Sequence, residues 1–243
     1  MQSEIVRILD NFTELIAELT AELTARKSQY QYYQDSLLTF SASVPRLTLS
    51  ECCVSIADGD HQPPPKTESG IPFITISNIN SYKKIDFTDT MFVSEKYYDG
   101  LDIKRKAQTD DILYTVVGSF GTPVYIDKDY KFAFQRHIAI LRPNKKLIIP
   151  KYLYYAMQSS TFHRQAESVA IGAAQRTISL TSLNNMKIPV PDLSEQARII
   201  SILDCFDTLC NDLISGLPAE IAARQKQYEY YRDKLLTFKE KKS

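Results

Sequence analysis

Hydrophobic side chains recur along residues 5–40 with alternating spacings of four and three, which is the heptad pattern of a helix that packs against another helix. Arg26 is the one polar member of this stripe. The pattern predicts a helix of about 36 residues, roughly 54 Å long if continuous, and we expect Pro45 to end it. The stripe consists of Ile5, Leu9, Phe12, Ile16, Leu19, Leu23, Arg26, Tyr30, Tyr33, Leu37 and Phe40.

A second heptad stripe covers residues 199–238, and its spacing slips once, where two steps of four follow each other at residues 213, 217 and 221. The slip coincides with Pro218, which cannot donate a hydrogen bond inside a helix, so we expect a kink or a break and restart there. One helix leads into the middle of the chain and the other leads out, which predicts an antiparallel coiled coil. The stripe consists of Ile199, Leu203, Phe206, Cys210, Leu213, Leu217, Ile221, Arg224, Tyr228, Tyr231, Leu235 and Phe238.

The two helical segments are copies of one sequence. Residues 8–12 (ILDNF) return at 202–206 (ILDCF), and residues 27–40 (KSQYQYYQDSLLTF) return at 226–238 (KQYEYYRDKLLTF), with one position shifted at the start. Such an internal repeat indicates homologous segments around a unique middle. Arg26 and Arg224 hold equivalent positions, where each is either a satisfied polar group that sets the register or a docking point for a partner. The repeated tyrosines are too many for one seam to bury, and exposed ones would mark a protein interface.

The middle of the chain has a different pattern, with short β-rich runs punctuated by Gly, Pro, Asn and Asp. The predicted strands lie at residues 71–76, 111–117, 122–126 and 138–143. Pro150 and the apolar spacing after it predict one helix from Lys151 to about Ser168. The fold class is therefore α+β, with a helical region at 1–43, a mixed domain at 44–192 and a second helical region at 193–243.

Composition adds modest constraints. The chain has 243 residues, 44% of them hydrophobic, and a formal net charge of zero, which is ordinary for a globular protein. Residues 44–192 carry 18 Lys/Arg against 15 Asp/Glu, so the middle is slightly basic while the flanks are slightly acidic. The four cysteines lack the spacing of a zinc site, so we expect reduced thiols and no metal or cofactor. No basic leader or apolar run of about 20 residues is present, which favours the cytoplasm and no membrane.

Motifs of catalysis are missing from this sequence. The string His61-Gln62-Pro63-Pro64-Pro65 lacks the acid or amide and the aromatic residue of an amino-methyltransferase motif, and residues 118–121 (GSFG) are too short for a nucleotide loop. His61, His137 and His163 are scattered. No set of residues meets the requirements of an active site, so we expect a protein that is not an enzyme.

The middle segment instead offers planar, hydrogen-bonding side chains on turns, which suit the edges of DNA bases. Lysines in the same region, with Arg105, could hold phosphates. For each residue the alternative is a solvated loop. The candidate DNA-binding residues are His61, Gln62, Ser77, Asn78, Asn80, Lys83, Lys84, Ser119, Gln135, Arg136, His137, Gln175, Arg176 and Thr177.

In combination, these segments resemble the specificity subunit of type I restriction–modification enzymes. The resemblance is carried by residues 58–61 (DGDH), 70–74 (GIPFI), 111–113 with 118–121, 135–137 (QRH), and 188–191 (IPVP) followed by Glu195-Gln196. Residues 216–238 are similar to that family's conserved helical region.

The resemblance implies a non-catalytic subunit that binds double-stranded DNA. In that family, two recognition domains each read one half of a split target. The helices space the domains and bind methyltransferase subunits, which use S-adenosylmethionine to methylate adenine, and a restriction subunit can join. This chain has one recognition domain, so it resembles half of such a subunit. It is either one half of a homodimer that reads a symmetric site or a truncated, silent cassette. A coiled-coil decoy that binds the methyltransferase and a stand-alone DNA enzyme are the rival hypotheses.

Overall fold

The long N-terminal helix expected from the heptad pattern is present in the computed structural model, which describes residues 2–59, 64–173, 175–211 and 216–237. By contacts the chain divides into two compact units, residues 1–33 with 201–243 and residues 34–200, and each is described by itself. None of the helices in these ranges is long and apolar enough to cross a membrane.

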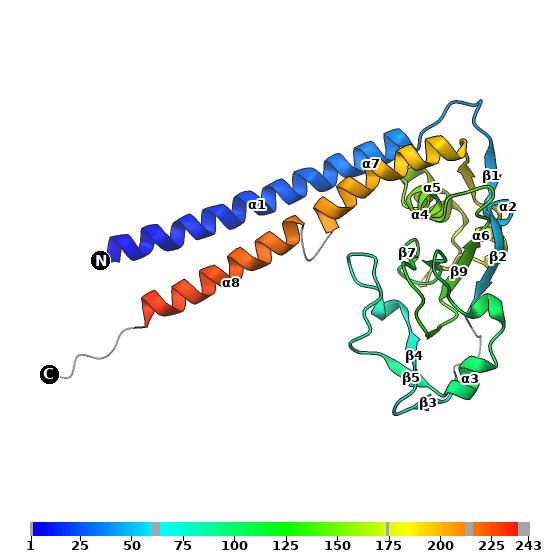
Figure 1. Ribbon diagram of the computed structural model, residues 1–243, viewed down its shortest axis with the longest axis horizontal. Coiled ribbons are helices and arrows are strands. Elements are labelled where there is room, and N and C mark those ends of the chain that lie inside the picture. The colour runs from blue at the N-terminus through cyan, green and yellow to red at the C-terminus, as the bar shows by residue number, and fades with distance from the viewer. Residues whose placement is uncertain (1, 60–63, 174, 212–215, 238–243) are drawn as a thin grey trace. The chain divides into compact units, whose positions relative to one another are not determined.

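The helical unit is built from α1 (Gln2–Leu37), the end of α7 (Leu193–Asn211) and α8 (Leu217–Leu236). Phe12 of α1 stacks on Tyr231 of α8 with ring centroids 5.5 Å apart, and Tyr33 of α1 stacks on Phe206 of α7 at 5.3 Å. Because low residue numbers of α1 meet high numbers in the second segment, the helices run antiparallel, as predicted (Figure 1).

The two stacks are made by equivalent residues of the repeat. Phe12 and Phe206 are equivalent in the repeat, as are Tyr33 and Tyr231, so each copy contributes the phenylalanine of one stack and the tyrosine of the other. Equivalent surfaces that exchange contacts in this way form a local two-fold arrangement. Each copy of the repeat therefore packs against the other copy through the same pair of side chains.

The repeated arginine is satisfied inside its own helix. Arg26 donates to Gln29 at 2.9 Å and to Glu22 at 3.4 Å, and Arg224 donates to Gln227 at 3.1 Å and to Glu220 at 3.4 Å. These contacts lie within a single helix, so they satisfy each guanidinium without deciding between a role in setting the register and a role in docking a partner. The repeated tyrosines divide as expected, since Tyr30 is buried whereas Tyr32 and Tyr230 are mostly exposed.

The predicted helix ends need one correction. The second segment breaks as expected, and α8 restarts with Gly216 as its N-cap and Pro218 in its first turn, where a missing N–H is tolerated. The expectation that Pro45 ends α1 was wrong, because α1 already ends at Leu37. Hydrogen bonds from the Leu38 and Thr39 N–H groups to Gln34 and Ser36 close its last turn.

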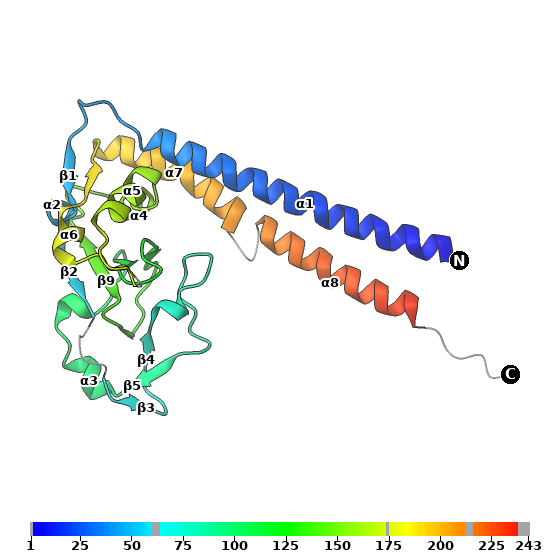
Figure 2. The same ribbon diagram turned by 180° about the vertical axis from the view of Figure 1, so that it is seen from behind.

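Residues 34–200 form a mixed unit with three sheets (Figure 2). One is a four-stranded antiparallel sheet in the order β2-β9-β6-β7, a second has the order β3-β5-β4-β8, and β1 pairs with β10. The strands are β1 (Arg46–Thr48), β2 (Cys53–Asp58), β3 (Lys66–Thr67), β4 (Ile71–Ile74), β5 (Met91–Val93), β6 (Ile112–Thr115), β7 (Pro123–Tyr125), β8 (Ala133–Phe134), β9 (Ile138–Pro143) and β10 (Lys187–Pro189). The helices are α2 (Leu49–Cys52), η1 (Ile76–Asn78), α3 (Glu95–Asp99), η2 (Ile103–Arg105), α4 (Pro150–Ala156), α5 (Ser160–Val169) and α6 (Leu180–Asn185).

The four predicted strands are confirmed as β4, β6, β7 and β9, with shorter bounds for the first three. Their apolar side chains supply much of a core that includes Leu113, Val124 and Ile140. The single helix expected from Lys151 to Ser168 was wrong, because α4 and α5 are separate. Ser159 lies between them in an extended conformation and accepts a hydrogen bond from the Phe162 N–H, which makes it the N-cap of a new helix.

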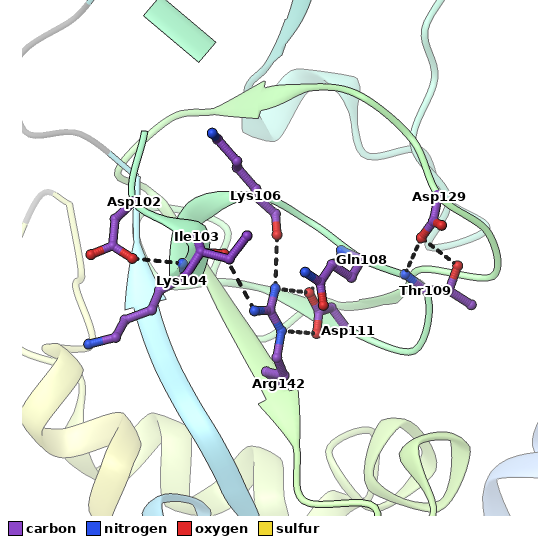
Figure 3. Close-up of polar contacts among 9 residues, drawn as sticks. All are labelled: Asp102, Ile103, Lys104, Lys106, Gln108, Thr109, Asp111, Asp129 and Arg142. Carbon is purple, nitrogen blue, oxygen red and sulfur yellow. Dashed lines mark hydrogen bonds and ion pairs between the residues drawn. The ribbon is translucent and has the colours of Figure 1, made fainter. Parts of the chain in front are cut away.

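A buried ion pair joins Asp111, which directly precedes β6, to Arg142 of β9. Arg142 donates from Nε and Nη2 to the two carboxylate oxygens of Asp111 at 3.0 and 2.8 Å, and Nη2 also donates to the Lys106 carbonyl at 2.9 Å (Figure 3). The Asp111 side chain is only 2% exposed. It also accepts a hydrogen bond from the Gln108 N–H at 2.9 Å. Fork-to-fork pairs of this kind have strict geometry, so this one fixes how the two strands are aligned.

We predict that Asp111→Asn lowers the free energy of unfolding by about 3 kcal/mol, because it leaves the Arg142 guanidinium without its counter-charge in a mostly buried site. Urea denaturation followed by circular dichroism measures the change. The control is Glu95→Gln, which removes a carboxylate that lies 3.7 Å from Lys131 at the surface. Equal denaturation midpoints for the two variants would contradict the prediction.

Candidate nucleic-acid interface

Three loops meet at one end of the sheet with the strand order β2-β9-β6-β7. They are residues 116–118 after β6, residues 135–137 before β9, and residues 175–178. The Val116 N–H donates to the His137 carbonyl at 2.9 Å, the Ile178 N–H to the Val116 carbonyl at 2.8 Å, and the Gly118 N–H to the Arg176 carbonyl at 2.9 Å. Backbone hydrogen bonds thus join segments about 20 to 60 residues apart in the sequence, which makes this surface a built site and not a set of separate loops.

An open hollow of about 470 Å³ lies among these loops. Its floor includes the apolar side chains of Val116, Val117 and Ile178. Its polar lining residues are Asp58, Arg136, His137, Gln175, Thr177 and Ser179. Four of the predicted DNA-binding residues, Arg136, His137, Gln175 and Thr177, are therefore brought together from two distant parts of the sequence.

The other predicted residues near the hollow differ in exposure. Ser119 is exposed on the turn after β6, and Gln135 is half-buried beside Arg136. Arg176 is half-buried and forms an ion pair with Glu167 of α5. Arg136 and Gln175 themselves are exposed, so they are the side chains best placed to contact a ligand.

A second group of predicted residues lies on another loop, between β4 and β5. Asn78 is buried, and its amide accepts from the Thr75 N–H at 2.9 Å and donates to the Asp89 carbonyl at 2.8 Å, so it braces the loop. The Asn80 amide oxygen accepts from the Tyr82 and Lys84 N–H groups, and Lys83 contacts Gln158. Ser77 and Lys84 are exposed. None of these five residues lines the hollow. His61 and Gln62 lie outside the described residues.

Two further positions shape the site without having been predicted for it. Asp58 is half-buried at the hollow, and its carboxylate lies 3.6 Å from the guanidinium of Arg105. Gly59 is buried so closely against the next loop that an added Cβ would lie 2.2 Å from the Phe134 carbonyl oxygen and 2.7 Å from the Arg136 nitrogen. The sequence alone did not indicate this close approach, because it depends on a strand 75 residues away.

The electrostatics of the site favour hydrogen bonding. Burial, reinforced by the neighbouring Arg136 charge, lowers the pKa of His137 below its usual range. A neutral imidazole can both donate and accept a hydrogen bond. With the guanidinium of Arg136 and the amide of Gln175, the site presents a mixed set of donors and acceptors suited to planar groups such as base edges.

The family model for the type I restriction modification DNA specificity domain matches residues 61–223. This range includes every loop of the hollow except the segment of Asp58. The chain belongs to the type I restriction–modification DNA specificity family.

Curated relatives agree with this family. The chain is 38% identical to the type I restriction enzyme EcoR124I/EcoR124II specificity subunit of Escherichia coli, over 98% of this chain and 59% of that protein. It is 32% identical to a putative type I restriction enzyme specificity subunit of Haemophilus influenzae, over 98% and 62%. The chain thus spans about three fifths of the length of these two relatives. A putative type I specificity subunit of Mycoplasma pneumoniae is 26% identical, over 99% of this chain and 94% of that protein.

Solved structures support the fold. The HsdS subunit from Thermoanaerobacter tengcongensis matches 96% of this chain with a TM-score of 0.63 and 18% identity, over 56% of that protein. The type I restriction–modification S subunit from M. genitalium matches 98% of this chain with a TM-score of 0.63 and 17% identity, over 61% of that protein. The α+β fold and the family resemblance predicted from the sequence are both confirmed.

We predict that Gly59→Ala lowers the free energy of unfolding by about 1–3 kcal/mol, the usual cost of overpacking, because the new methyl group would collide with backbone atoms of residues 134–136. Urea denaturation provides the measurement. The control is Gly100→Ala, where the nearest atom, the Lys96 carbonyl oxygen, would be 3.4 Å away. If Gly59→Ala were no less stable than Gly100→Ala, the close approach at Gly59 would be disproved.

Proposed function

We propose that this chain is a DNA-reading subunit of a type I restriction–modification system, and that it recognises one half of a split target through the hollow of the specificity domain. The observation that carries the proposal is the meeting of Arg136, His137, Gln175 and Thr177 at one hollow in a chain of this family. Arginine pairs with guanine and glutamine with adenine through paired hydrogen bonds in the major groove. Residues 44–192 read DNA in this proposal.

The subunit itself is not an enzyme and has no cofactor of its own. Its helical segments, residues 1–43 and 193–243, bind the methyltransferase subunits that modify adenine, and a restriction subunit joins the same assembly. The exposed repeated tyrosines Tyr32 and Tyr230 support this role, because tyrosine is enriched where proteins meet. These partners place the protein in the cytoplasm.

A second recognition domain completes the split target, and we infer that a second copy of the chain supplies it. The repeat supports this inference, because equivalent residues of its two copies differ in their contacts and in their exposure to solvent. In the first copy, the Asp35 carboxylate accepts hydrogen bonds from the Ser160 N–H at 2.8 Å and the Ser160 hydroxyl at 2.6 Å, at the N-terminus of α5. Leu38 beside it is 6% exposed.

The equivalent residues of the second copy are open to solvent. Asp233 corresponds to Asp35 and its side chain is 68% exposed, and Leu236 corresponds to Leu38 and is 52% exposed. The end of α8 therefore carries a contact set that α1 uses on its own recognition domain. Such a surface fits the same kind of domain contributed by another chain.

The function is tested by mapping methylation in cells. The chain is expressed with its neighbouring methyltransferase subunit in a host without DNA methylation, and modified adenines are located by sequencing. A split palindromic motif is expected, because two identical recognition domains read two identical half-sites. An asymmetric motif would contradict the homodimer but not DNA recognition. A stable complex that methylates no motif would contradict the proposal and favour a silent cassette or a decoy.

We predict that Arg136→Ala and Gln175→Ala each weaken binding to the mapped target by about tenfold or more, since each removes a potential paired contact to a base. Fluorescence anisotropy measures the affinity for target and random duplexes at a fixed salt concentration. Lys146→Ala, which removes an equal charge from an exposed loop outside the hollow, is the control for Arg136→Ala. Unchanged target preference in both hollow variants, with unfolding unaffected, would show that these side chains do not read DNA.

A further inference from the structure

Arg176 lies in the chain between Gln175 and Thr177, which both line the hollow, but its charge is already engaged by a neighbouring side chain. Its Nη1 forms an ion pair with the Glu167 carboxylate, and its Nη2 donates to the Glu167 carbonyl at 2.6 Å. Its guanidinium also lies 5.2 Å from the centre of the Phe120 ring. The Arg176 and Glu167 side chains are 38% and 42% exposed. The pair is thus accessible to a large ligand such as DNA.

The surrounding backbone fixes this cluster in place. Phe120 lies on a turn between Gly118 and Gly121, whose φ angles of +70° and +97° are strained for other residues. The Gly118 N–H donates to the Arg176 carbonyl at 2.9 Å, which joins the turn to the arginine. The turn and Arg176 are therefore positioned together.

The Glu167 carboxylate on α5 lies close to the nitrogen atoms of two other side chains. One is Arg176, and the other is His163, whose Nε2 lies 3.6 Å from the Glu167 carboxylate. A carboxylate at this point repels DNA phosphates as well as competing with them for the guanidinium. It therefore acts against any contact that offers Arg176 only a phosphate oxygen.

We propose that Glu167 is a specificity-determining residue, which withholds Arg176 from DNA in general and releases it for the correct target. This inference rests on the proposed function. An exposed ion pair contributes little free energy, so it exchanges readily when a better partner is offered. A guanine edge offers Arg176 two acceptors in one plane. The Phe120 ring can support the guanidinium in either state, because a cation–π contact leaves its edge available.

The proposal has a measurable consequence for binding that does not depend on sequence. Glu167→Gln keeps the size of the side chain but removes its charge, so Arg176 becomes available to phosphates. We expect the affinity for a random-sequence duplex to rise several-fold, and the slope of log K against log salt to steepen by about 1, the value for one further phosphate contact. Affinity for the mapped target should rise less, so the ratio of target to random binding should fall.

Two matched variants make the test specific to this pair. Glu95→Gln removes the same charge from an exposed carboxylate that pairs with Lys131, and it should leave the random-duplex slope as in the unmodified chain. The double variant Glu167→Gln with Arg176→Gln should lose the gain in affinity, because no guanidinium is left to contact a phosphate. Two residues that act through one contact have effects that do not add. Fluorescence anisotropy over a series of salt concentrations gives both affinity and slope.

The proposal is overturned if Glu167→Gln binds a random duplex with the affinity and slope of the unmodified chain. It is equally overturned if the gain persists without Arg176 or is matched by Glu95→Gln. Failure of the proposed function has a different signature, namely that the unmodified chain prefers no target. In that case the random-duplex measurements would still show whether Glu167 keeps Arg176 from contacting phosphates.

Discussion

The buried pair of Asp111 and Arg142 fixes the alignment of the two strands that carry two loops of the hollow. Asp111 immediately precedes β6, and Arg142 lies near the end of β9. These strands pair antiparallel, with Ile112 opposite Leu141 and Thr115 opposite Ile138. Two of the three loops of the hollow, residues 116–118 and 135–137, leave from the other ends of the same two strands. A slip of one residue would turn every side chain of a strand to the opposite face, so an ion pair at one end controls which groups meet at the other.

The helical unit is held together by contacts between two copies of one sequence. Two copies of one segment run antiparallel and exchange the same phenylalanine–tyrosine stack, so a single set of side chains supplies both halves of the contact. The repeat also leaves an asymmetry. In the first copy Asp35 accepts hydrogen bonds from Ser160 and Leu38 is buried, while the equivalent Asp233 and Leu236 of the second copy are exposed. In the proposed homodimer, this exposed end of α8 is where the second copy of the chain binds.

The hollow combines backbone segments that are held in place with polar side chains that remain exposed. Gly59 and the backbone bonds among the three loops fix where the side chains start, whereas Arg136 and Gln175 remain exposed at the hollow. Arg176 differs from them, because a neighbouring carboxylate already occupies its guanidinium. The proposed function requires such differences, since charge that is equally available everywhere increases binding to all DNA sequences.

Much of this protein was determined by local pattern. The heptads, the repeat, the break at Pro218 and the four apolar strands were predictable because each depends on residues near one another in the chain. The single helix expected at residues 151–168 failed where Ser159 caps a new helix, a role that spacing alone did not indicate. Of the candidate site residues, sequence identified Arg136, His137, Gln175 and Thr177 by type, but not that they share one hollow, nor that Asn78 is buried as a brace. Only the tertiary structure decided those points, because they depend on contacts between segments distant in the sequence, such as Gly59 against Phe134 and the Gly118 N–H against the Arg176 carbonyl.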